Sequence, residues 1–165
     1  MPCCNFVTAS IVMISLSPPS FGQAPALVGA SKAEEFVLFG VNFFKAIKSK
    51  PTHQKVKKVK NQYGESKPDE WHTDTYSGFR VEFLRAASAP YDLLSNLTIS
   101  DPSIKLPFGI SIGNTKSQII QVLGQPTSQK KNELEYEIGD IQTETAYFKF
   151  ANDRLVQVKW SYEID

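Results

Sequence analysis

Helix signals are densest in Ile112-Gly-Asn-Thr-Lys-Ser-Gln-Ile-Ile-Gln-Val-Leu-Gly-Gln-Pro126. Thr115 suits a helix N-cap, and Gln118 stands three positions later, where a capping box needs it. An apolar face follows, and Gly124 and Pro126 are typical of the end of a helix. The segment therefore predicts a short amphipathic helix with both ends specified.

A fainter copy of this pattern lies upstream, in Thr52-His-Gln-Lys-Val-Lys-Lys-Val-Lys-Asn-Gln-Tyr-Gly-Glu-Ser66. The pairs that match are Val59 with Ile119, Tyr63 with Leu123, Gly64 with Gly124 and Tyr76 with Tyr136. The copy predicts a helix over His53–Gln62, capped by Thr52 and ended by Gly64. Together the two copies predict an α+β fold of two tandem units, each with helices packed on an antiparallel β-sheet, over residues 27–104 and 105–165.

The rest of the chain supplies one more helix and a set of strands. Ser31 and Glu34 form a second capping box, which predicts a helix over Ser31–Lys48. Extended segments are predicted at Trp71–Tyr76, Phe79–Phe83, Leu93–Ser100, Asn132–Ile138, Thr143–Ala151 and Leu155–Tyr162. Asn152-Asp153 predicts a tight turn before the last strand. Simple alternation places Val156, Val158, Trp160 and Tyr162 on one face of that strand.

The N-terminus resembles an export signal. An uncharged, mostly apolar run from Phe6 to Leu16 is followed by Ala24-Pro-Ala26, which has the spacing of a cleavage site. We expect a signal peptide over residues 1–26 and a periplasmic or secreted mature protein, although no Lys or Arg precedes the apolar run. A loosely packed tail is the alternative. Cleavage would remove both cysteines, Cys3 and Cys4.

Charge argues against one class of partner and suggests another. The chain of 165 residues has a net charge of +1, whereas general nucleic-acid binders are usually strongly basic. Seven lysines and no acidic residue stand between Glu35 and Glu65. This stretch is either a solvated helix face or a patch for an anionic membrane surface or acidic polymer. The candidate residues for such a patch are Lys55, Lys57, Lys58 and Lys60.

The second unit resembles a known family. The pattern Gly113-x-Thr115-x-x-Gln118-Ile119-x-x-x-Leu123-Gly124-x-Pro126, with Tyr136 and the stretch Tyr147–Val158, resembles the BamE-like (SmpA/OmlA) domain. It is also similar to the fold of the beta-lactamase inhibitor protein, which carries a helix pair on an antiparallel sheet twice in tandem. The resemblance implies an envelope or secreted protein that binds other proteins and has no catalytic residues. The lipidated cysteine of the assembly-machine members and the disulfides of the inhibitor have no counterpart here.

Catalytic and metal-binding patterns are weak. The two histidines, His53 and His72, have no further ligands at a spacing typical of a metal site, and no cofactor motif is present. A hydrolase would need a serine and an acid brought to His72 by the fold. Glu133, Glu135 and Glu137 share one strand face, which favours a wet sheet surface facing basic residues on neighbouring strands.

We therefore expect a non-enzymatic, exported protein-interaction module whose partner binds the open face of a sheet. Exposed aromatic and basic side chains are common binding anchors. The candidates are Trp71, Arg80, Tyr147, Lys149 and Lys159. The two alternatives are an envelope-surface protein that binds anionic lipid or polymer through the lysine-rich helix, and a hydrolase.

Overall fold

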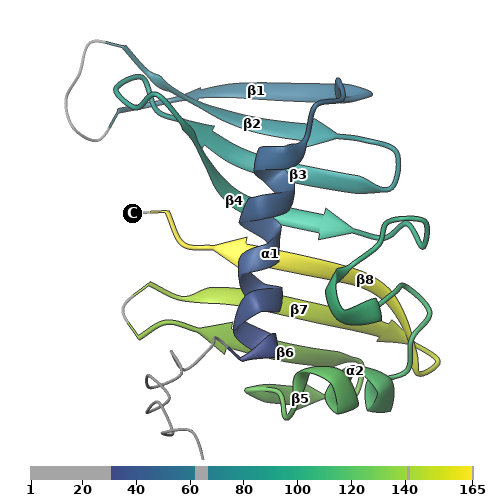
Figure 1. Ribbon diagram of the computed structural model, residues 1–165. Helices are drawn as coiled ribbons and strands as arrows, with labels where there is room; N and C mark the ends of the chain where they lie inside the picture. The colour runs from purple at the N-terminus through teal and green to yellow at the C-terminus, as the bar shows by residue number, and fades with distance from the viewer. Residues whose placement is uncertain (1–30, 62–66, 141, 165) are drawn as a thin grey trace, which may run out of the picture.

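The computed structural model describes residues 31–61, 67–140 and 142–164. Within these residues eight strands form a single antiparallel sheet, with two α-helices and one 3-10 turn (Figure 1). The strands are β1 (His53–Val59), β2 (Asp69–Thr75), β3 (Phe79–Arg85), β4 (Asp92–Ile99), β5 (Ser128–Lys130), β6 (Glu133–Ile138), β7 (Glu144–Ala151) and β8 (Arg154–Tyr162). The helical elements are α1 (Lys32–Ala46), η1 (Pro107–Gly109) and α2 (Lys116–Leu123).

The prediction of two tandem helix-on-sheet units is wrong. The strand order is β1-β2-β3-β4-β8-β7-β6-β5, so two four-stranded meanders join edge to edge. Residues Asn96–Ile99 of β4 pair with Ser161–Val158 of β8, which makes the two halves one continuous sheet. The expected boundary at residues 104 and 105 falls in the loop between β4 and η1. Pairing between segments so distant in the chain leaves no local pattern in the sequence.

The lysine-rich helix expected over His53–Gln62 is also wrong, because this segment is the edge strand β1. All seven of its residues from His53 to Val59 pair with β2. Thr52 caps no helix, and its hydroxyl instead donates to the Thr75 carbonyl at 2.8 Å. Neither face of β1 is deeply buried, so its sequence carries no apolar alternation that would have revealed a strand. Tyr63 and Gly64 of the expected repeat lie outside the described residues.

Helix α1 crosses one face of the sheet from β6 towards β3 (Figure 1) and covers the core. The capping box of Ser31 and Glu34 is confirmed. Phe36 is fully buried, with its ring centroid 5.0 Å from Phe148 and 5.3 Å from Trp160. Two hydrogen bonds fix the helix to β8, because Trp160 Nε1–H donates to the Phe36 carbonyl and the Tyr162 hydroxyl to the Val37 carbonyl.

Helix α2 has the ends that the sequence predicts. Thr115 and Gln118 form the expected capping box, and Gly124 follows the last helical residue. Gly124 has φ 87° and ψ −168°, which is outside the left-handed helical region that is usual for a glycine at the end of a helix. The Tyr136 hydroxyl donates to the Gly124 carbonyl at 2.9 Å and so attaches the helix end to β6.

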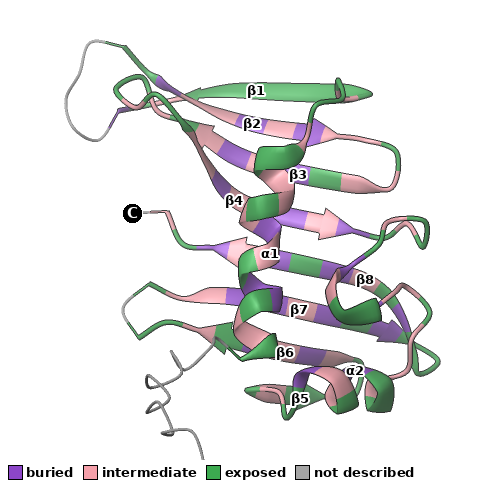
Figure 2. Ribbon diagram, in the orientation of Figure 1, coloured by how far each residue is buried: buried purple, intermediate pink, exposed green. Residues whose placement is uncertain are grey.

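Burial alternates along the central strands (Figure 2), which defines a closed and an open face of the sheet. Val158 and Trp160 are fully buried towards α1, while the intervening Lys159 is exposed. Val156 does not share their face as predicted and is 38% exposed. A β-bulge explains this, since Lys149 pairs with Gln157 and Phe150 with Leu155, which leaves Val156 outside the ladder.

The expected signal peptide over residues 1–26 lies outside the described residues. In the part of the chain that the structure describes, no helix combines the length and hydropathy needed to cross a bilayer.

Candidate functional site

The open face of the sheet carries a row of side chains in register across the strands. Through successive pairs the row runs from Glu135 to Tyr147, Lys159, Thr98, Arg80 and Thr75. Side chains of paired residues lie on the same face of a sheet. The fold therefore brings Arg80, Tyr147 and Lys159 into line, although they come from separate strands.

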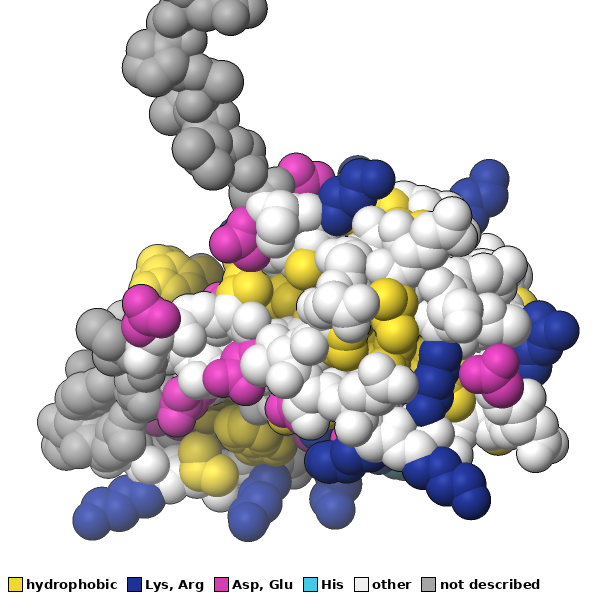
Figure 3. All heavy atoms as spheres, turned by 90° about the horizontal axis from the view of Figure 1, so that it is seen from below, with side chains coloured by type: hydrophobic (Ala, Val, Ile, Leu, Met, Phe, Trp, Pro, Cys, Tyr) yellow, Lys and Arg dark blue, Asp and Glu magenta, His cyan; other side chains and the backbone are white. Residues whose placement is uncertain are grey.

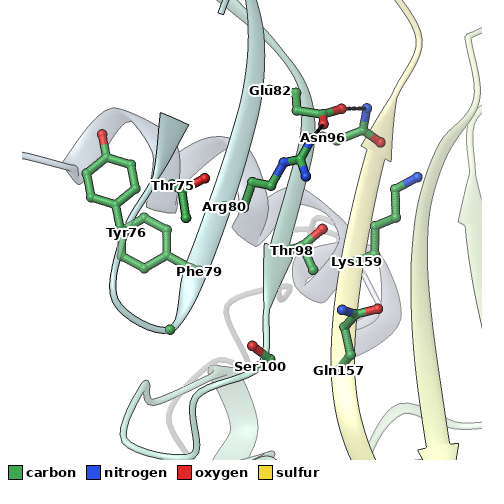
Figure 4. A pocket seen from close by; sticks show the side chains of 11 residues that line it. Thr75, Tyr76, Phe79, Arg80, Glu82, Asn96, Thr98, Ser100, Gln157 and Lys159 are labelled. Carbon is green, nitrogen blue, oxygen red and sulfur yellow. Dashed lines mark hydrogen bonds and ion pairs between the residues drawn. The ribbon is translucent and has the colours of Figure 1, made fainter. Parts of the chain in front are cut away.

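A depression of about 490 Å³ lies at the centre of this face, over β3, β4 and β8 (Figure 4). Its wall at one end is an aromatic pair, because the rings of Tyr76 and Phe79 stack with centroids 4.4 Å apart. The other lining residues are polar or charged apart from Gly78, and they are Thr75, Arg80, Glu82, Asn96, Thr98, Ser100, Gln157 and Lys159. A partner would meet hydroxyl, amide and cationic groups here.

One of the two cations in this depression is already engaged. Arg80 forms an ion pair with Glu82, which also accepts a hydrogen bond from Asn96 Nδ2 at 3.2 Å (Figure 4). Lys159 forms no ion pair with any described carboxylate. Asn96 Oδ1 is buried without a hydrogen-bond partner among the described residues. The depression thus offers one ammonium group, that of Lys159, without a described carboxylate partner.

A second depression of about 340 Å³ adjoins the first and shares Gln157 and Lys159 with it. Its remaining lining residues are Glu133, Tyr147 and Lys149. Glu133 stands opposite Lys149 in the ladder, as the sequence suggested for this row of glutamates. We call the two depressions together the sheet groove. Four of the five candidate residues line it, namely Arg80, Tyr147, Lys149 and Lys159.

Trp71 lies on the same face but apart from the sheet groove. It is four residues from Thr75 along β2, which corresponds to about 13 Å at the usual strand rise. Trp71 and Leu84, which are paired, line a separate depression of about 260 Å³ together with Ile164. The structure therefore places Trp71 as a neighbour of the groove and not as part of it.

The candidate lysines do not form one basic face. On strand β1, Lys55 and Lys57 are directed to the open face, and Lys58 to the opposite face. Lys60 follows the end of the strand. All four are exposed. A lysine-rich edge strand is also a common device against edge-to-edge pairing of sheets. The prediction that these lysines share one face of a helix, which motivated the anionic-surface hypothesis, is therefore wrong.

His72 lies on the closed face and is 3% exposed. Its ring stacks on Phe83 with centroids 4.7 Å apart, and its Nε2 is 3.2 Å from Glu70 Oε2. The ring therefore packs within the closed face. Among the described residues, no group of three or more His, Cys, Asp or Glu side chains is placed to hold a metal ion.

Sequence reasoning missed a cavity of about 640 Å³ among the described residues, which is larger than the depression at the centre of the open face. It lies beneath the C-terminal half of α1, where the start of β4 and the end of β8 separate. We call it the β4–β8 wedge. The sequence carries one signal, because the apolar residues of β4 change phase between Leu94 and Leu97 and do not keep a strict two-residue alternation. That change marks the bulge at Ser95, where Phe83 pairs with Leu94 and Glu82 with Asn96.

Comparisons of the chain with protein-family models, curated proteins and solved structures found no match. They therefore provide no link to the BamE-like family or to the beta-lactamase inhibitor proteins.

Proposed function

We propose that this protein is a non-enzymatic interaction module that acts after export and binds another protein through the open face of its sheet. The observation that carries the proposal is the sheet groove. It gathers Arg80, Tyr147, Lys149 and Lys159 from strands β3, β7 and β8 on a face that α1 does not cover. Binding by shape and charge needs no reactive group.

The chemistry of the groove favours a partner with an acidic side chain at its centre. The Lys159 ammonium has no described carboxylate partner, and Tyr147 beside it offers an aromatic face and a hydroxyl. Tyr and Arg are enriched among residues that dominate binding energy at interfaces.

Site-specific photocrosslinking in the native host tests this proposal. A photoreactive phenylalanine at Tyr147 or Thr98 should yield a discrete protein adduct. The matched control is the same group at Leu38, which is 42% exposed on α1 and distant from the groove. Adducts that form equally at Leu38, or at none of the three positions, would contradict the proposal.

Charge reversal supplies a second readout. Lys149→Glu with Lys159→Glu should abolish the adduct, because both ammonium groups line the groove. Lys105→Glu with Lys131→Glu makes the same change in net charge at exposed positions outside the groove and should leave the adduct intact. If both pairs of substitutions reduced the yield of the adduct equally, the net charge of the protein and not the groove would control binding, which would contradict the proposal.

The intact mass and cellular fraction of the native protein test the export part of the proposal. A mass lacking the first 24 to 26 residues, in an envelope or secreted fraction, is the expected result. A full-length cytoplasmic protein would contradict export and leave the groove proposal to the crosslinking experiment.

A further inference from the structure

The β4–β8 wedge has an identifiable structural cause. Strand β4 pairs with β3 from Asp92 to Ile99 but with β8 over Asn96–Ile99. Strand β8 continues to pair with β7 as far as Tyr162. The first half of β4 therefore diverges from the end of β8 (Figure 1). Val41, Phe44 and Lys45 of α1 line the space between them.

The walls of the wedge are mainly apolar and aromatic. Its apolar and aromatic lining residues are Val41, Phe44, Tyr91, Leu93, Leu94, Tyr162 and Ile164. The Tyr162 hydroxyl is committed to the Val37 carbonyl at 2.6 Å, so this residue offers its ring and not a free donor. A volume of about 640 Å³ is within the range of small-ligand sites in proteins.

The lining of the wedge carries more acidic than basic side chains, namely Asp92, Glu144 and Glu163 against Lys45. Asp92 is neutralised by Arg85, with two hydrogen bonds of 2.9 and 2.8 Å. Glu144 and Glu163 form no ion pair with any described cation, and Lys45 is exposed at the end of α1. Glu144 is half-buried, and desolvation raises the pKa of its carboxyl group. Desolvation of a carboxylate that has no cation partner among the described residues is destabilising, and a bound cation would offset this cost.

We infer that the β4–β8 wedge is a binding site for a small amphiphile with an alkyl chain and an ammonium head, with Glu144 as the counter-ion. The apolar walls suit the alkyl chain. The rings of Phe44, Tyr91 and Tyr162 on the same lining suit a substituted ammonium, because cations are attracted to aromatic faces. The inference is independent of the sheet groove, which lies on the other face of the sheet.

Calorimetry of the full chain with n-octyltrimethylammonium, below the concentration at which it forms micelles, tests the site. Saturable binding of one molecule per chain is expected. n-Octyl sulfate has the same alkyl chain and the opposite charge, and its affinity should be lower by at least about tenfold. Equal binding of the two probes, or no saturable binding of the cation, would overturn the inference.

Variants locate the binding. Glu144→Gln should weaken binding of n-octyltrimethylammonium about tenfold. The control is Glu137→Gln, at an exposed position of β6 outside the wedge, which should bind as the parent does. Val41→Phe narrows the wedge from the helix side and should reduce binding of both probes. Unchanged affinity in both Glu144→Gln and Val41→Phe, with folding verified by circular dichroism, would place the probe elsewhere and overturn the inference.

Discussion

Gly40 of α1 lies so close to Tyr162 of β8 that a β-carbon at position 40 would overlap the tyrosine hydroxyl. The same carbon would lie 3.0 Å from Trp160 Cγ. In the sequence, Gly40 only weakens the prediction of a helix. In the structure it allows a close approach between helix and sheet, next to the hydrogen bonds from Trp160 and Tyr162 to the helix carbonyls.

Gly40→Ala should therefore destabilise the protein, by about 1–3 kcal/mol, because it overpacks the contact between α1 and β8. Denaturant unfolding measures the loss. Asn42→Ala, at an exposed position of the same helix, is the control and should change stability little. A gain of about 1 kcal/mol in Gly40→Ala, as expected for a simple helix position, would contradict the close approach.

Removing the hydroxyl should relieve part of this cost. In the Gly40→Ala background, Tyr162→Phe should destabilise less than it does in the parent, since the overlapping atom is then absent. Additive effects of the two substitutions would argue that Tyr162 does not limit position 40.

Gly124→Ala should destabilise for a different reason. A β-carbon there meets nothing within 4 Å, so space is available. However, φ 87° with ψ −168° is a backbone conformation that is essentially restricted to glycine, and we expect a cost of about 1–3 kcal/mol. Thermal or denaturant unfolding tests this, with Gln125→Ala as the adjacent control. Unchanged stability in Gly124→Ala would contradict the positive φ of residue 124 at the end of α2.

Tyr136 should make stability fall at high pH. Burial raises its pKa from 10.0 to about 12. Because the folded state keeps this proton longer than the unfolded state, the contribution is complete below pH 10 and is lost as the pH rises towards about 12. Denaturation midpoints between pH 8 and pH 12 should show the fall. Tyr162, whose pKa burial also raises, acts in the same direction.

Tyr136→Phe isolates this contribution. The variant should show a smaller loss of stability between pH 10 and pH 12 than the parent. At neutral pH it should cost about 1–2 kcal/mol, because the Gly124 carbonyl loses its donor. An unchanged pH profile would contradict the role of this hydroxyl.

Glu144 should act on stability in a lower pH range. Desolvation raises the pKa of the Glu144 carboxyl group above 4.5 in the folded protein. The stability that comes from holding this proton is therefore present below pH 4.5 and is lost as the pH rises through the folded-state pKa. Glu144→Gln removes the charge and should be more stable than the parent at pH 7 and similar to it at pH 3. The same difference from the parent at both pH values would contradict this. Glu137→Gln is again the control.

The lysines of β1 should protect the edge of the sheet. Replacing Lys55, Lys57 and Lys58 with Thr keeps β propensity but removes charge from an exposed edge strand. We expect self-association, which light scattering at matched concentration will detect. The control variant makes the same charge change at exposed positions outside the strand, Lys48, Lys50 and Lys105. Equal behaviour of the two variants would contradict edge protection.

The candidate groove was partly predictable. Alternation along β7 and β8 places Tyr147, Lys149 and Lys159 opposite the buried residues, and this needs no knowledge of the neighbouring strands. Which strands stand side by side was not predictable. Arg80 reaches the groove because β4 pairs with β8, and Trp71 remains outside it because of its place along β2. The β4–β8 wedge depends on the same long-range pairing.

The sequence by itself determined the local structure of this protein. The capping boxes at Ser31 and Thr115 and the turn at Asn152-Asp153 depend on contacts between residues close in the chain. Most strands were indicated by the local alternation of apolar and polar residues. Only the tertiary structure decided that the two halves share one sheet and that the Thr52–Gln62 segment is extended. An edge strand is held by the backbone hydrogen bonds of its neighbour, and these bonds leave no side-chain pattern.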